Sequence, residues 1–157
     1  MTSGKQFEKL QSAAKKILDF HKLQDHCSAV LFESNEPTVF TYKLRSISFS
    51  TELLELLSMD EISALVAHEV GHLYLAKDLL QAGKENNLRM IRVVELKSDA
   101  VSLVTLKAIG LDPEVLISAI GKLKQAREKN GYEISREKNP SFNDRRALLD
   151  KYLKLKN

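Results

Sequence analysis

Residues 68–72 read His-Glu-Val-Gly-His, and this short run constrains the fold because its chemistry requires a helix. Residues four apart lie on one face of an α-helix, so His68 and His72 can turn a ring nitrogen toward the same ion. Such an H-E-x-x-H run predicts a zinc site with Zn–N distances of about 2.0 to 2.1 Å. Zinc acidifies a bound water, and the neighbouring Glu69 is placed to accept its proton as a general base.

The residues around the run indicate where its helix begins and what lies against it. Ser58 followed by Glu61 forms a capping box before an apolar-periodic stretch, which predicts a helix start. Gly71 lies inside that helix, where glycine costs about 1 kcal/mol relative to alanine. We therefore expect another element to approach closely at Gly71.

A catalytic zinc site needs a third protein ligand, and the sequence limits the choice. Its four histidines are His21, His26, His68 and His72, so no histidine downstream of the motif can serve. Glu95 in the helical stretch 93–100 is the expected third ligand. Asp99, one turn further on, is expected to accept a hydrogen bond from the outer nitrogen of a ligating histidine. His21 and His26 are assigned no role.

The H-E-x-x-H run followed by E-x-x-x-D resembles the gluzincin metallopeptidases, and the chain looks most like their HtpX-like and CAAX-prenyl-protease-like family, peptidase family M48. The resemblance spans about residues 38 to 153, and three further stretches carry it. The first is the order of segments 45–49, 51–57 and 58–73. The others are the run Gly110-Leu111-Asp112-Pro113 and the run from Asn139-Pro140-Ser141 to Arg145. The resemblance implies a zincin-like catalytic domain in a minimal soluble form and a zinc metalloendopeptidase activity.

The C-terminal segment departs from the family pattern at one position. Asn139 stands where the family usually has a histidine before proline; it can donate a hydrogen bond to an oxyanion but cannot act as an acid. The resemblance also places an arginine at Arg145, which could pair with an acidic site residue, support Asn139 or help stabilise the tetrahedral intermediate. Tyr132 is a further oxyanion candidate, although an exposed tyrosine without a role is the alternative.

Composition agrees with a small enzyme. The 157 residues are 43% hydrophobic and contain no Pro/Gly/Ser-rich linker or repeat, so residues 1–157 are expected to form a single domain. The one cysteine, Cys27, excludes an internal disulfide and is expected in the core. With no signal-like apolar segment, a cytoplasmic location follows as an expectation. The net charge of +3 gives no reason to expect nucleic acid, and no apolar run reaches the roughly 20 residues of a transmembrane helix.

Periodicity predicts an α+β fold that is mostly helical, with a small sheet containing antiparallel strands. The segments 27–33 and 38–43 are expected to pair as a hairpin around Ser34-Asn35-Glu36-Pro37. The segment 45–49 is nominated as the sheet edge to which a peptide substrate adds, and an interior strand with no ligand role is an equally weighted alternative. Gly83 and Gly110 are expected to mark helix ends. The predicted helices are 6–23, 51–57, 59–81, 87–109, 113–129 and 143–154.

The primary hypothesis is a zinc-dependent metalloendopeptidase that acts on a peptide or protein substrate, with the oligomeric state left open. An alternative is a regulatory protease of the ImmA/IrrE type, although the 139–145 segment argues against it. Another is a zinc-containing module that binds peptides without cutting them. Retention of Glu69 argues against this second alternative, because a structural zinc site needs no base, whereas Asn139 in place of the usual histidine keeps it open.

Overall fold

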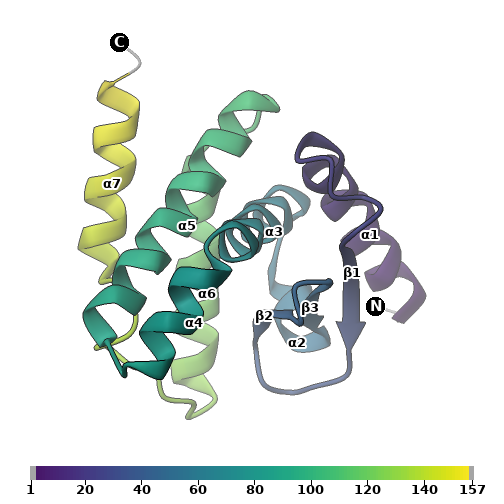
Figure 1. Cartoon of the computed structure of the whole chain (residues 1–157). Helices are drawn as coiled ribbons and strands as arrows, with labels where there is room; N and C mark the ends of the chain where they lie inside the picture. Colours follow the sequence, from purple (N-terminus) through teal and green to yellow (C-terminus); the bar gives the residue numbers. More distant parts are fainter. Residues whose placement is uncertain (1–2, 156–157) are drawn as a thin grey trace.

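The computed structural model describes residues 3–155, which form a small sheet with helices on one side and beside it (Figure 1). No helix among these residues has both the length and the apolar character needed to cross a membrane. The predicted mostly helical α+β class is confirmed. In chain order the elements are α1 (Ser3–Phe20), β1 (Ser28–Phe32), β2 (Val39–Tyr42), β3 (Ser46–Ser50), α2 (Thr51–Leu56), α3 (Met59–Tyr74), α4 (Ala76–Lys84), α5 (Leu88–Ala108), α6 (Glu114–Lys129) and α7 (Phe142–Lys154).

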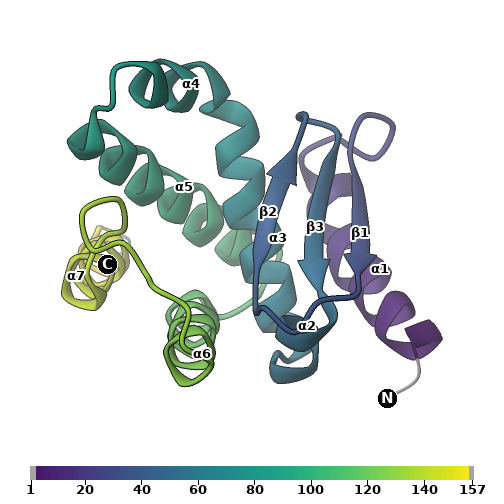
Figure 2. The ribbon, with the colours of Figure 1, turned by 90° about the horizontal axis from the view of Figure 1, so that it is seen from below.

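The strand order differs from the sequence prediction. The order is β1-β3-β2, with β3 parallel to β1 and antiparallel to β2. The predicted hairpin of the first two strands is therefore wrong, and so is the assignment of 45–49 as the edge, since this segment is the central strand. The edges are β1 and β2, as Figure 2 shows.

The turn chemistry explains this error. The true hairpin joins β2 to β3 through Lys43 and Leu44, whose φ angles are 48° and 60°. A tight hairpin turn needs this left-handed backbone, but its usual signature is Asn-Gly or Asp-Gly rather than Lys-Leu. The polar segment 33–38 carries stronger turn residues. This segment instead connects the edge strands β1 and β2 by crossing the end of the central strand β3.

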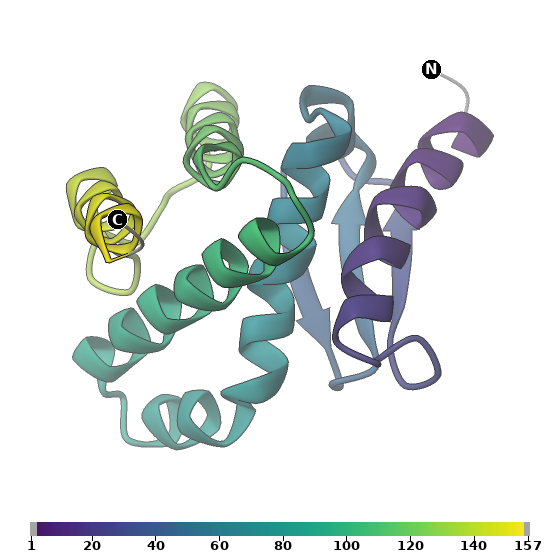
Figure 3. The same cartoon turned by 90° about the horizontal axis from the view of Figure 1, so that it is seen from above.

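Helix α3 lies between two apolar clusters and so forms the centre of the structure. On one side, α1, α2 and the sheet contribute a core that includes Leu10, Ile47 and Phe49, all fully buried, together with the predicted core residue Cys27. On the other side, α5, α6 and α7 pack a second cluster against Ala64. Figure 3 shows α1 and α3 lying across the same face of the sheet.

The helix boundaries confirm the predicted starts better than the predicted ends. The capping box of Ser58 and Glu61 opens α3 as expected. The predicted helix 59–81 is divided at Leu75, where the chain turns so that α4 packs back against α5 and buries Ala82. The sequence has no glycine or proline at this break, so local sequence does not indicate it. The packing of α4 against α5 imposes the break instead. Gly110, with φ of +80°, ends α5 as predicted, whereas Gly83 lies inside α4.

Gly71 makes the close approach that the sequence predicts. A Cβ atom built at this position would lie 2.6 Å from the Cα of Ser98 in α5 and 2.8 Å from its Cβ. Any side chain at position 71 therefore requires the two helices to move apart. The α3–α5 contact is the most extensive between elements of the fold, so this displacement would be felt at residues on both helices.

We expect Gly71→Ala to lower the free energy of unfolding of the metal-free protein by about 1 to 3 kcal/mol, because the added methyl overpacks the α3–α5 contact. Gly121→Ala is the matched control, since a Cβ there meets nothing within 4 Å inside a helix. It should raise stability by up to about 1 kcal/mol. Urea unfolding measures both, and equal effects of the two substitutions would contradict the steric explanation.

Candidate active site

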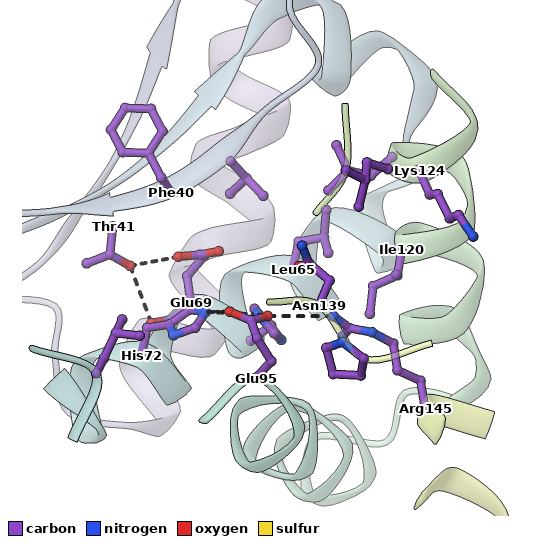
Figure 4. Close-up of a pocket in the computed structure, with 16 residues that line it drawn as sticks. Phe40, Thr41, Leu65, Glu69, His72, Glu95, Ile120, Lys124, Asn139 and Arg145 are labelled. Carbon is purple, nitrogen blue, oxygen red and sulfur yellow. Dashed lines mark hydrogen bonds and ion pairs between the residues drawn. The ribbon is translucent and has the colours of Figure 1, made fainter. Parts of the chain in front are cut away.

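Helices α3, α5 and α7 and the loop before α7 bring the predicted site residues together at a single cleft (Figure 4), with Asp99 just behind its lining. Helix α3 contributes His68, Glu69 and His72 from the centre of the fold. Helix α5 contributes Glu95, facing them across the Gly71–Ser98 contact. The chain thus folds so that residues from well-separated segments converge on the H-E-x-x-H face.

The geometry of this convergence fits a metal ion. The Nε2 atoms of His68 and His72 are 3.1 Å apart. The Glu95 carboxylate oxygens lie 3.4 Å and 3.2 Å from these two nitrogens. Ligands at about 2.0 to 2.1 Å in tetrahedral geometry would be separated by about 3.3 Å. The donor atoms of His68, His72 and Glu95 are therefore spaced as three corners of a tetrahedral site that fits one divalent cation.

Asp99 and Ser98 orient the two histidines. Asp99, only 1% exposed, lies 2.8 Å from Nδ1 of His68, so it accepts the proton of that nitrogen and makes Nε2 the nitrogen that faces the cation position. The Oγ of Ser98 lies 3.5 Å from Nδ1 of His72 and provides a longer, weaker contact of the same kind. The placement of Asp99 agrees with its expected role.

Arg145 lies behind the carboxylates. Its Nη1 donates to both oxygens of Asp99, at 2.5 and 2.6 Å, and its Nη2 lies 3.6 Å from Glu95. The guanidinium is nearly buried and its donors face these two acids. Of the roles expected for Arg145, the geometry supports pairing with an acidic site residue rather than direct contact with an oxyanion.

Glu69 has a position distinct from the metal-facing ligands. Its donor atom lies within 4.8 Å of those of both histidines, so the three residues form a metal-capable group on distance alone. However, Thr41 of β2 donates a hydrogen bond of 2.8 Å to its Oε2. Glu95 also approaches both histidine nitrogens more closely. Sequence reasoning missed Thr41, because a threonine in a strand carries no signal of a catalytic neighbour.

The cleft has a volume of about 400 Å³ and two different walls. Strand β2 forms one wall. The other is largely aliphatic, with Lys124 near it, and comes from α3, α6 and the segment after α6: Leu65, Ile120, Leu123 and Ile134. An extended peptide can therefore meet backbone on one side and an apolar surface on the other.

The remaining candidates differ in position. Asn139 lines the cleft, but one of its Nδ2 protons goes to the carbonyl of Ser135, at 2.9 Å. It therefore stays an oxyanion candidate, with one amide proton still available.

The other candidates lie outside the cleft. Tyr132 is absent from the cleft lining and instead lies against the guanidinium of Arg127. His21 contacts Tyr74 and Thr105, away from the proposed metal ligands.

A sequence model described as Peptidase family M48 matches residues 4–93, which is more than half of the chain. The chain belongs to peptidase family M48. The match begins well before the expected start at residue 38. It ends two residues before Glu95, so the ligand and positioning roles on α5 and α7 depend on the geometry above. A search of curated proteins finds no match.

Membership of M48 makes the chain a metal-dependent peptidase in general terms and sets aside the ImmA/IrrE alternative. The site geometry agrees with metal dependence. Three carboxylates, on Glu69, Glu95 and Asp99, lie close to the two histidines, and among residues 3–155 Arg145 is the one Arg or Lys paired with any of them. This group of residues with neutral histidines therefore carries two excess negative charges. A divalent cation would balance them. Unbalanced buried charge is otherwise costly.

The charged surroundings also shift two pKa values in this M48 site without metal. Burial alone would lower the pKa of His68, but hydrogen bonds and charges from Asp99 and Glu95 outweigh it and raise this pKa to about 10. Burial likewise opposes ionisation of Glu95, yet contacts with His68 and His72 hold its pKa well below the ordinary range. The metal-free site therefore holds a proton on His68 at neutral pH.

We expect metal binding at pH 8 to release about one proton, because the cation must displace the His68 proton. With an ordinary histidine pKa near 6.5, nearly no proton would be released at that pH. Affinity should accordingly fall about tenfold per unit as pH is lowered from 9 to 7. Calorimetry of zinc binding in buffers of different ionisation enthalpy counts the protons. A count near zero would show that His68 is already neutral.

Proposed function

We propose that this M48 chain is a zinc-dependent metalloendopeptidase. The observation that supports it best is the set of 3.1 to 3.4 Å separations among the donor atoms of His68, His72 and Glu95. Two imidazoles and one carboxylate with an open fourth position are typical of catalytic rather than structural zinc sites. Glu69 beside them supplies the base that a structural site would not need.

The protein groups then have separate tasks. Bound zinc supplies a Lewis acid that acidifies water and polarises a carbonyl. Glu69 accepts the proton of the attacking water and is placed to return it to the leaving amine. Asp99 holds the His68 tautomer, and Arg145 holds Asp99 and Glu95 in place. Asn139 is the proposed donor to the tetrahedral oxyanion, through its second amide proton.

Substrate is proposed to add as a strand to β2 rather than to 45–49. The carbonyls of Thr38 and Tyr42 accept bonds from Ser50 and Arg45 at the two ends of the β2–β3 pair. Because such bonds alternate along an antiparallel pair, the backbone groups of Val39 and Thr41 point away from β3. Both residues line the cleft. Their free N–H and C=O groups can pair with any internal peptide segment, which favours endopeptidase action.

Substitution of the base and of a ligand tests the catalytic assignment. Glu69→Gln should reduce cleavage of an unstructured protein at least about 100-fold while zinc content stays near one per chain, because the ligands are intact. Glu95→Ala should lose both zinc and activity. Elemental analysis and a chelator-controlled cleavage assay provide the readouts. Undiminished cleavage by Glu69→Gln would exclude Glu69 as the base, and zinc without any cleavage by the wild type would favour a peptide-binding module.

Substitution at Val39 tests the binding edge. Val39→Pro removes the backbone N–H that faces the cleft but leaves the β2–β3 bonds intact, since edge positions tolerate proline. We expect KM to rise about fivefold or more, by loss of one main-chain hydrogen bond of about 1 kcal/mol. Val39→Ala keeps the N–H and is the matched control. An equal change in KM for both variants would mean that the side chain matters and the strand pairing does not.

A further inference from the structure

Thr41 occupies a position that neither the metal site nor the β2–β3 pair explains. Its Oγ1 donates to Oε2 of Glu69 at 2.8 Å, and the carbonyl of Glu69 lies 3.5 Å from the same hydroxyl. Figure 4 shows Thr41 reaching from the strand toward the H-E-x-x-H helix. The hydroxyl thus connects the edge strand of the cleft to the carboxylate beside the metal ligands.

Glu69 has no other side-chain anchor in the part of the chain that the structure describes. The metal-facing histidines are held by Asp99 and Ser98, and Glu95 by Arg145. The Glu69 carboxylate has Thr41 as its one hydrogen-bond partner within residues 3–155. A glutamate has three rotatable side-chain bonds, so a carboxylate without an anchor would sample positions away from the water.

We propose that Thr41 is a positioning residue for the base Glu69, and that it makes the base respond to the strand that carries the substrate. The inference rests on the proposed zinc endopeptidase function. With Oε2 held by the hydroxyl, Oε1 is the carboxylate oxygen left to accept the proton of the attacking water. No bond of Thr41 is made or broken in the reaction; the hydroxyl only fixes the acceptor.

The position of Thr41 on β2 gives its contact with Glu69 a second consequence. Thr41 is β-branched and therefore stiff about χ1, so its hydroxyl direction follows the β2 backbone. The N–H and C=O of the same residue face the cleft, where a substrate strand would pair. A peptide bound along β2 therefore fixes the backbone that carries the Glu69 anchor. Long extended substrates should consequently be turned over faster than short ones that leave β2 unpaired.

A purely structural role for Thr41 would have different consequences. The long contact to the Glu69 carbonyl could serve only to tie β2 to α3. Loss of that tie would weaken folding and substrate binding together, and it would affect kcat and KM alike. A positioning role instead acts on kcat at saturating substrate, because it changes the fraction of bound complexes in which the base is aligned.

The experiment compares Thr41→Val, which is nearly isosteric but lacks the hydroxyl, with Thr41→Ser, which restores it. Thr38→Val is the matched control: it makes the same exchange just before β2, where the Thr38 hydroxyl has no partner among residues 3–155. Zinc-loaded proteins are assayed on an extended peptide for kcat, KM, zinc content and melting temperature. Thr41→Ala provides a second hydroxyl-free variant should Thr41→Val fold poorly.

The expected result is a kcat lowered about 10- to 100-fold in Thr41→Val. KM and zinc content should change less than about twofold, Thr41→Ser should keep at least about a third of wild-type kcat, and Thr38→Val should match the wild type. An unchanged kcat in Thr41→Val, or an equal loss in Thr41→Ser, overturns the inference while leaving the proposed function intact. A zinc-loaded wild type that cleaves nothing, or an active Glu69→Gln variant, overturns the proposed function and the inference with it.

Discussion

The contact of α3 with α5 at Gly71 brings the proposed metal donors of the two helices together. His68 and His72 are arranged by helix geometry alone, but the third donor belongs to a different helix. Glu95 reaches both ring nitrogens because the backbone of Ser98 lies against a residue with no side chain. The glycine that lowers helix propensity therefore gives the site its tetrahedral spacing.

Charge balance explains the arrangement of the charged residues behind the proposed metal donors. Glu95 and Asp99 lie one turn apart on α5, where two nearly buried carboxylates would repel each other. Arg145 from α7 lies against both, and His68 carries a proton between them when no metal is bound. A divalent cation held by His68, His72 and Glu95 would take the place of that proton without adding an uncompensated charge. The same residues can thus remain folded in the metal-free and metal-bound protein, with Arg145 supplying the constant positive charge.

The sequence predicted the parts of the structure that depend on local chemistry. Ser58 and Glu61 located the start of α3, Gly71 the close helix contact, and the E-x-x-x-D spacing the pair on α5. The sequence failed where tertiary packing decides. Nothing local distinguishes Lys43-Leu44 as a hairpin turn, or Leu75 as the residue where α3 ends and α4 turns back toward α5. The edge strand was misplaced for the same reason, and the contact of Thr41 with Glu69 went unseen with it.

The two sides of the cleft differ in rigidity, and this difference suits their tasks. The proposed metal ligands are on α3 and α5, which pack against each other between the two apolar clusters, and His68 and Asp99 have buried polar partners. The proposed substrate side is an edge strand whose backbone pairs with β3 alone. Its side chains add the Thr41 hydroxyl contact to α3, the packing of Val39 on the core and a ring contact of Phe40 with Phe32. A fixed ligand set keeps the donor spacing constant through each turnover. An edge strand with one strand partner can adjust to different peptide backbones. Under the proposed function, its hydrogen bond to Glu69 is the direct route by which that adjustment would reach the attacking water.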